Sequence, residues 1–207
     1  MMTPSQRISA WVRRVPTWPI YGFGLVMPAW LLWQGMTGGL GVEPISALEH
    51  RLGELALQFL ILSLAITPIR DIFNVHLVKF RRSIGLVAFF FICLHFLVWL
   101  VLDVQVLSSI WADILKRPYI TVGFVGFLLL IPLAVTSSNY FIRKMGPKKW
   151  RRLHQLSYAA GILGCLHFLM LVKGLQLEPI IYAVVLGGLL AYRVNWRALV
   201  TRQRHAS

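Results

Sequence analysis

One pentapeptide, Cys-Leu-His-Phe-Leu, occurs twice in this chain and places a histidine at His95 and another at His167. Each copy lies inside a long apolar run, where a histidine is costly unless it has a partner. Low-spin b-type haem needs an imidazole on each side of its iron, and two neighbouring helices can supply them. The duplication therefore predicts a haem ligated by His95 and His167. The alternative is that each imidazole hydrogen-bonds a carbonyl or hydroxyl across a helix bundle.

A third histidine, His154, raises the question of a second haem. It lies thirteen residues before His167, which corresponds to about 20 Å along a continuous helix. On an ideal helix the two side chains would point about 140° apart. A haem at His154 would be singly ligated or would take a second ligand such as His76. The alternative is an interfacial histidine among basic neighbours.

His50 and several arginines could contact such a cofactor. His50 comes just before an apolar run, beside Arg51, and could bind a haem propionate, line a quinone pocket or cap a helix. Guanidinium groups pair well with carboxylates, so arginines at the ends of the apolar runs are candidate propionate partners. Their ordinary role is to orient the spans. The candidates at the basic end are Arg81, Arg82 and Arg151.

The two cysteines limit how a haem could be held. Cys93 and Cys165 are the only cysteines, and neither begins the C-x-x-C-H pattern of covalent c-type haem attachment. We therefore expect a non-covalent haem b.

Composition indicates a membrane protein. Of 207 residues, 57% are hydrophobic and 14% charged, which is more apolar surface than a soluble domain of this length could bury. The net charge of +14 would ordinarily suggest nucleic acid as a partner. The basic residues, however, lie at the ends of apolar runs, as topology determinants do. We therefore expect the lipid bilayer, and no nucleic acid, as partner.

The hydrophobic pattern predicts an all-α integral membrane protein, a bundle of six transmembrane helices. We expect a membrane domain at 15–192, preceded by a polar segment at 1–14 and followed by a basic tail at 193–207. The first apolar run has a basic start, but no small-residue cleavage site follows it, so we interpret it as an uncleaved span. The predicted spans are 15–36, 52–68, 84–102, 118–138, 150–171 and 179–192.

The distribution of Lys and Arg predicts the orientation. The N-terminal segment, the second and fourth loops and the tail hold three, four, six and four of them, which is 17 of the 21. The other loops hold Arg51, Lys116, Arg117 and Lys173. By the positive-inside rule both termini are cytoplasmic. Spans three and five then run in the same direction, so His95 and His167 share a depth near the outer face and the haem lies between these two spans.

Several function classes have no motif here. No glycine-rich nucleotide-binding pattern follows a strand-like run, and no paired acids or Ser/His/Asp arrangement suggests hydrolysis. We therefore expect an electron-transfer subunit that is not by itself the catalyst. Its electrons would come from a membrane quinol or a separate flavoprotein.

Several stretches resemble the MsrQ (YedZ) family of haem-binding membrane subunits. The stretches are GGLGVEP, SLAITPIRD, RRSIGL, RPYITVG and KKWRRLHQLSYAAGILGCLH, together with the His50-x-x-Gly53-x-x-Ala56-Leu57 segment. The family serves the bacterial periplasmic protein-methionine-sulfoxide reductase and is related to ferric reductase-like transmembrane domains. The resemblance implies that His95, His154 and His167 are haem-associated.

The resemblance also implies a place in electron transfer. Electrons would pass from the quinone pool, either directly or through FMN, to a periplasmic molybdopterin subunit that repairs oxidised methionines. The chain would then lie in the bacterial inner membrane. Alternative functions are a cytochrome b subunit of another dehydrogenase, a ferric reductase, or a small transporter whose histidines relay protons.

Overall fold

The computed structural model describes residues 4–104, 114, 116–172 and 174–194, and helices make up most of this part of the chain. The predicted basic tail, apart from its first two residues, and Lys173 of the outer set lie outside the described residues. The α-helices are α1 (Pro4–Arg14), α2 (Trp18–Met36), α3 (Pro44–Phe73), α4 (Arg81–Val98), α6 (Pro118–Val135), α7 (Asn139–Met145), α8 (Pro147–His154), α9 (Leu156–Leu171) and α10 (Leu177–Arg193). A short 3₁₀ turn, η1 (Val78–Phe80), precedes α4, and a π-helical segment, η2 (Trp99–Val104), follows it.

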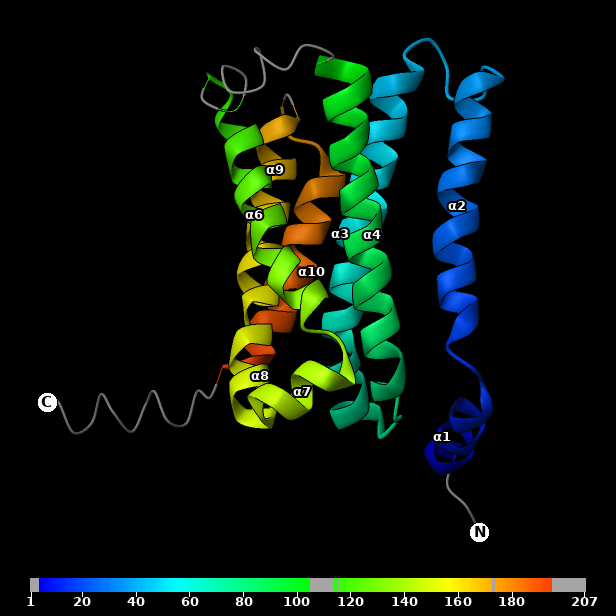
Figure 1. The fold of residues 1–207 in the computed structure, drawn as a ribbon, viewed down its shortest axis with the longest axis vertical. Coiled ribbons are helices and arrows are strands. Elements are labelled where there is room, and N and C mark those ends of the chain that lie inside the picture. Colours follow the sequence, from blue (N-terminus) through cyan, green and yellow to red (C-terminus); the bar gives the residue numbers. More distant parts are fainter. Residues whose placement is uncertain (1–3, 105–113, 115, 173, 195–207) are drawn as a thin grey trace, which may run out of the picture.

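The long helices of the described residues stand side by side in one bundle (Figure 1); they are α2, α3, α4, α6, α9 and α10. The most extensive packing joins α3 to α4 and α6 to α9. The two pairs meet through contacts of α4 with α6 and of α3 with α9, while α10 packs on α9 and α3 and α2 packs on α4 and α3. The bundle is therefore built from two helix pairs, and each pair includes one copy of the repeated pentapeptide.

Prolines, and residues with a positive φ angle, lie at many of the helix boundaries. α2, α3, α6 and α8 each begin with proline in the first or second position, where the missing N–H costs no helical hydrogen bond. α3 ends at Asn74, which adopts a left-handed backbone conformation with φ 58°. Gly146, with φ 76°, separates α7 from α8. Pro118 coincides with the predicted start of span four, whereas α3 extends beyond the predicted limits of 52–68 at both ends.

Two predicted spans differ from the sequence expectation in detail. The third changes from α-helix to π-helix at Trp99, one turn after His95. The fifth was expected as one helix from Trp150, but a turn at Gln155 divides it into α8 and α9. His154 is therefore the last residue of a separate short helix. The angle of about 140° between the side chains of His154 and His167, expected on one ideal helix, does not apply. The polar segment at 1–14 is also largely helical, as α1.

The core consists of two apolar clusters, one on each side of α3. In the first, Leu52 and Ala56 pack with Val87 and with the fully buried Phe91. The second joins α3 to α9 and α10; its members are Leu57, Ile61, Leu64, Cys165 and Leu186. α3 is thus the central helix of the bundle, since opposite faces of it belong to different clusters.

Three helices in the described part are long and apolar enough to cross a membrane: Pro44–Phe73, Val78–Asp103 and Pro118–Val135. These correspond to the predicted spans two, three and four. α2, α9 and α10 run alongside them over much of the bundle height (Figure 1). Large apolar side chains on α2 point outward; Val26 is 68% exposed and Met36 73% exposed. Such a surface fits a lipid environment better than water.

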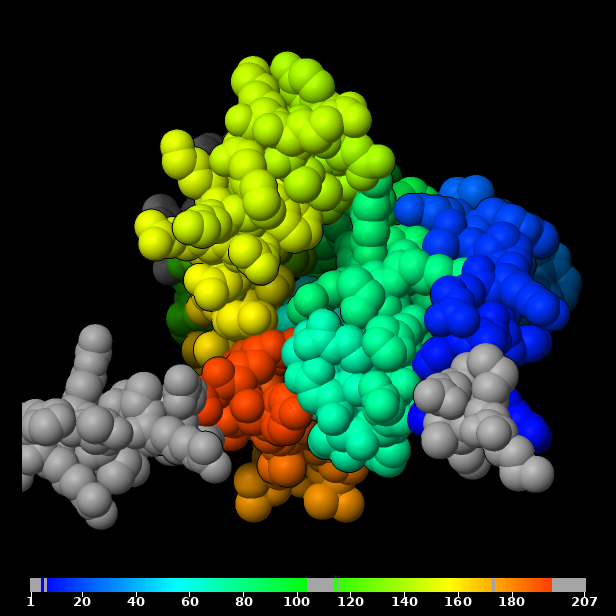
Figure 2. Space-filling model, turned by 90° about the horizontal axis from the view of Figure 1, so that it is seen from below, coloured from blue at the N-terminus to red at the C-terminus, as the bar shows by residue number. Residues whose placement is uncertain are grey.

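One end of the bundle is basic. α1, the α3–α4 connection, α7, α8 and the end of α10 all reach this end (Figure 1), and Figure 2 shows them side by side when the molecule is seen from below. Lys79 fastens α1 to this end, because its ammonium donates to the backbone carbonyls of Arg13 and Val15 at 2.9 and 2.5 Å. The charge asymmetry found in the sequence is therefore also an asymmetry of the folded molecule.

Candidate functional site

His95 is fixed in one tautomer by a contact between α4 and α3. Its Nδ1 lies 2.8 Å from the backbone carbonyl oxygen of Glu49. Because a carbonyl can only accept, Nδ1 carries the proton and donates it. The lone pair of the ring is then on Nε2. This is the arrangement that orients metal-ligating histidines in proteins.

His167 repeats the arrangement in the other helix pair. Its Nδ1 lies 2.7 Å from the carbonyl oxygen of Tyr119, at the start of α6, and must also be the donor. The predicted alternative, a hydrogen bond to a carbonyl across the bundle, is thus present at both histidines. It occupies only one nitrogen of each ring and leaves Nε2 with its lone pair for a ligand.

A glycine lies behind each ring, four residues after the residue that supplies the carbonyl. A β-carbon on Gly53 would come within 3.0 Å of His95 Nδ1, and one on Gly123 within 2.8 Å of His167 Nδ1. Both imidazoles therefore rest in notches that only glycine leaves open. The two helix pairs, α3–α4 and α6–α9, hold their histidines in the same way.

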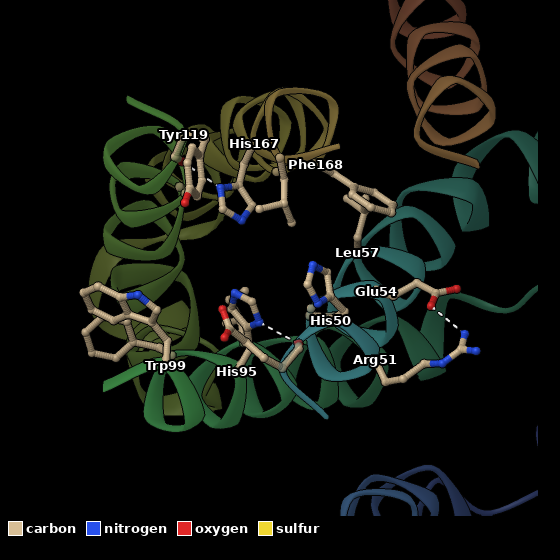
Figure 3. Close-up of a pocket in the computed structure, with 18 of the residues that line it drawn as sticks. His50, Arg51, Glu54, Leu57, His95, Trp99, Tyr119, His167 and Phe168 are labelled. Atoms are coloured by element: carbon tan, nitrogen blue, oxygen red, sulfur yellow. Dashed lines mark hydrogen bonds and ion pairs between the residues drawn. The ribbon is translucent and has the colours of Figure 1, made fainter. Parts of the chain in front are cut away.

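The two imidazoles face one another across the bundle (Figure 3). Their ring centroids are 6.2 Å apart and their planes meet at 78°. A metal bonded by two opposed imidazole nitrogens at about 2.0–2.1 Å would separate the centroids by about 6.3 Å, since each nitrogen lies about 1.1 Å from its ring centre. The observed separation thus equals that required for one metal ion between two axial histidines.

His95 and His167 line a cavity of about 960 Å³. Its inner walls are apolar, made by Leu57, Leu60, Ala88, Ile92, Phe127, Leu130 and Ala160. One end of the cavity is polar; it lies where α3, α6 and α10 begin and where α4 and α9 end. This polar end is lined by Glu43, Glu49, His50, Arg51, Glu54, Asp103, Arg117 and Glu178. The cavity therefore suits a large, flat apolar molecule with charged groups on one edge.

A polar cluster separates this cavity from a smaller one of about 320 Å³ between α2 and α3. Glu54 pairs with Arg51 at 3.0 Å and accepts hydrogen bonds from Gln58 and Tyr182 at 2.9 and 3.1 Å. Tyr182 is on α10, so the cluster also joins α10 to α3. A carboxylate with three donors is well satisfied in this setting.

His50 reaches the same cavity from the start of α3 (Figure 3). Its Nδ1 donates to the carbonyl oxygen of Ser46 at 2.7 Å, so its Nε2 also keeps a lone pair. His50 therefore lines the cavity that contains His95 and His167. Which of its three predicted roles it has stays a prediction.

His154 lies outside the cavity lining, in the basic half of the molecule. Its Nε2 is 3.1 Å from Thr136 Oγ1, and its ring stacks on Trp150 with centroids 3.9 Å apart. Thr136 donates its one hydroxyl proton to the Pro132 carbonyl oxygen at 2.6 Å, so the hydroxyl accepts from His154. His154 is therefore protonated on Nε2, opposite to His95 and His167.

The remaining candidates are also at the basic end and do not line the cavity. Arg82 donates to the Asn139 side chain at 3.1 Å, Arg151 donates to the carbonyl of Pro147 in its own helix, and Arg81 is partly exposed at the start of α4. His76 lies against Ser9 of α1, whereas His154 contacts Thr136 and Trp150. The structure thus does not bring His76 and His154 together.

Sequence reasoning missed several residues of the site. Gly53 and Gly123 lie in segments that were noticed, but no role was assigned to either. Each lies four residues after the residue whose carbonyl accepts from a histidine, Glu49 or Tyr119, and the sequence alone does not mark those two residues. Trp99, in the cavity wall one turn after His95, gave no signal of its own beyond its type.

Comparison with known proteins agrees with this arrangement. Residues 52–165 match the family described as "Ferric reductase like transmembrane component". A protein of Agrobacterium fabrum, "Protein-methionine-sulfoxide reductase heme-binding subunit MsrQ", is 46% identical over 189 residues, covering 91% of this chain and 87% of that protein. The chain belongs to the MsrQ family. A Brucella ovis member with the same description is 45% identical over 187 residues, covering 90% of this chain and 84% of its own length. No solved structure matches the chain.

Membership of the MsrQ family confirms the resemblance seen in the motifs. The ferric reductase match includes His95 and His154 but ends at Cys165, before His167. The MsrQ relatives cover nearly the whole chain. Among the described residues no group of three or more His, Cys, Asp or Glu side chains could by itself hold a metal ion. Two opposed histidines suffice for a metal that brings its own in-plane ligands, as haem iron does.

Proposed function

We propose that this chain is a membrane b-type cytochrome that holds one haem between α4 and α9, with His95 and His167 as axial ligands. The observation that carries the proposal is the facing pair of imidazoles, 6.2 Å apart, each with Nδ1 donating to a backbone carbonyl. The MsrQ relatives, described as haem-binding subunits, support the same cofactor. When bound, haem supplies a one-electron carrier.

The chain's own residues fit that cofactor in shape and polarity. The apolar inner walls would cover the macrocycle, and the polar end would receive its two propionates. At that end Arg51 and His50 are basic groups that line the cavity. Arg81, Arg82 and Arg151 do not line it, so any propionate they bind would belong to a second haem. His154 would be the candidate ligand of that haem, through its unprotonated Nδ1, since its Nε2 donates to Thr136.

The proposed topology has six spans, formed by α2, α3, α4, α6, α9 and α10, with both termini cytoplasmic. It rests on the 17-to-4 charge split and on the common end reached by α1, α8 and the last turn of α10. The polar end of the cavity then faces the periplasm. The membrane domain of 15–192 remains the proposed unit, set in the bacterial inner membrane.

The chain would act as an electron conduit for a separate catalyst. Its short connections leave no space for a substrate-reducing domain, and the haem lies toward the outer face. The acceptor we propose is a periplasmic, molybdopterin-containing methionine sulfoxide reductase subunit. The description of the MsrQ relatives supports a partnership with a protein-methionine-sulfoxide reductase, and the periplasmic location and the molybdopterin come from the family resemblance. The donor we propose is a quinol of the membrane pool or a flavin reductase, with FMN involved by family resemblance alone.

The test is a reconstitution of electron delivery. Purified protein should be red, with a Soret band. After reduction, its haem should be reoxidised only when the periplasmic molybdoenzyme and a methionine sulfoxide substrate are both present. A His167→Ala variant should lose this response, while His76→Ala should keep it.

Each alternative predicts a different result. A reduced haem that ignores the molybdoenzyme but is reoxidised by a ferric chelate would indicate a ferric reductase, a function to which the family match also points. A colourless preparation from haem-sufficient cells would reject the cytochrome and favour the transporter.

A further inference from the structure

Trp99 carries a hydrogen-bond donor that the described part of the protein leaves without a partner. Its indole is 7% exposed, and its Nε1 has no hydrogen-bond partner among the described residues. Buried polar atoms in proteins are nearly always paired, because an unmade hydrogen bond costs free energy. An indole N–H can donate but cannot accept, so its partner must be an acceptor. An unpaired buried donor beside a cavity is therefore an indication of what the cavity binds.

The position of Trp99 connects it to the histidine site. It follows His95 by four residues, which places it on the same face of the helix, one turn nearer the polar end of the cavity. Its indole forms part of the cavity wall next to His95 (Figure 3). The backbone changes from α-helix to π-helix at this residue, and such insertions often occur at functional sites.

The protein's own acceptors at this end do not satisfy the indole. Glu49 and Asp103 line the same cavity, yet neither carboxylate is hydrogen-bonded to Nε1. A ligand that enters the cavity can supply the missing acceptor. In haem, the strong acceptors are the two propionate carboxylates, which lie together on one edge of an otherwise apolar macrocycle.

We propose that Trp99 is a cofactor-positioning residue whose Nε1–H donates to a propionate carboxylate. The inference rests on the proposed haem site at His95 and His167 and assigns the edge of the cofactor that faces the polar end. Trp99 at the start of η2 and His95 on the preceding helix α4 would hold the cofactor at two points. The hydrogen bond is charge-assisted, which makes it stronger than a bond to a neutral acceptor.

The experiment compares haem with haem dimethyl ester, in which both carboxylates are blocked. Apoprotein in detergent is reconstituted with each, and the rate of release to excess apomyoglobin is measured. The variant is Trp99→Phe, and the matched control is Trp33→Phe, whose indole is half exposed and packs on Trp30. Trp99→Phe should release haem about ten- to a hundred-fold faster than wild type, from the usual strength of hydrogen bonds to charged groups. With the dimethyl ester, whose carbonyl oxygens are neutral and weaker acceptors, Trp99→Phe should accelerate release much less than it does with haem.

Other outcomes overturn the proposal. Equal release of haem by wild type and Trp99→Phe means that Nε1–H makes no bond to it. An equal acceleration for haem and ester means that Nε1–H makes no charge-assisted hydrogen bond to a propionate carboxylate. If Trp99→Phe fails to fold, benzothienylalanine at position 99 keeps the indole shape with sulfur in place of N–H and should give the same two results. If wild type binds neither porphyrin, the haem site itself is wrong, which is a separate and recognisable failure.

Discussion

Gly123 lies directly behind the imidazole of His167, so close that a β-carbon there would come within 2.8 Å of Nδ1. Gly53 stands in the same relation to His95, at 3.0 Å. Each glycine is four residues after the residue whose carbonyl accepts from the ring. The site is thus two copies of one local arrangement, a histidine from one helix set in a glycine notch of its partner.

Alanine in either notch should weaken haem binding. The methyl group would push the imidazole away from its carbonyl acceptor, and loss of such a supporting contact commonly lowers metal affinity about 10- to 100-fold. Gly123→Ala should be the more severe, because its contact is the shorter. Gly85→Ala on α4 is the matched control, since nothing lies within 4 Å of a β-carbon there. The haem-to-protein ratio measures the effect, and equal ratios in all three variants would contradict it.

His95→Ala and His167→Ala should each abolish the low-spin haem spectrum. Removal of either imidazole leaves one axial position without a protein ligand. Absorption and electron paramagnetic resonance spectra of the purified variants provide the measurement, and His76→Ala serves as the control. If both single variants keep the wild-type spectrum and haem content, the pairing of His95 with His167 is wrong.

His154→Ala should leave that haem in place. Its Nε2 is hydrogen-bonded to Thr136 and its ring stacks on Trp150, so its removal should cost stability, about 0.5–1.5 kcal/mol for the hydrogen bond. We expect one haem per chain in wild type and in this variant. Thr136→Val should lower the Tm similarly. A ratio of two in wild type that falls to one in His154→Ala would instead establish a second haem.

Reporter fusions should place the basic end in the cytoplasm. Alkaline phosphatase fused after the last residue should be inactive, and a fusion in the connection between α2 and α3 should be active. The physical reason is the excess of Lys and Arg at the end reached by α1, α7 and α8. Activity at the C-terminus would overturn the proposed orientation and the periplasmic position of the cavity's polar end.

The sequence by itself determined the helical class and the pair of histidines. Long apolar runs in a chain this hydrophobic have no other stable form in a bilayer than helices, because each backbone group must find a partner inside the segment. The repeated pentapeptide identified His95 and His167 because a costly residue type recurred in the same surroundings. Proline positions fixed several helix starts for a similarly local reason.

Only the tertiary structure decided what each histidine contacts. In the sequence His154 was a candidate ligand of a second haem, yet the turn at Gln155 and the Thr136 hydroxyl give it a different tautomer from His95 and His167, and it lies outside the cavity lining. Trp99 became significant only when its indole was found buried without a partner among the described residues. The carbonyls that orient His95 and His167 belong to Glu49 and Tyr119, whose side chains have no part in those bonds. Every residue has a backbone carbonyl, so the amino-acid letters cannot mark the two that matter, and the packing of α3 on α4 and of α6 on α9 selects them.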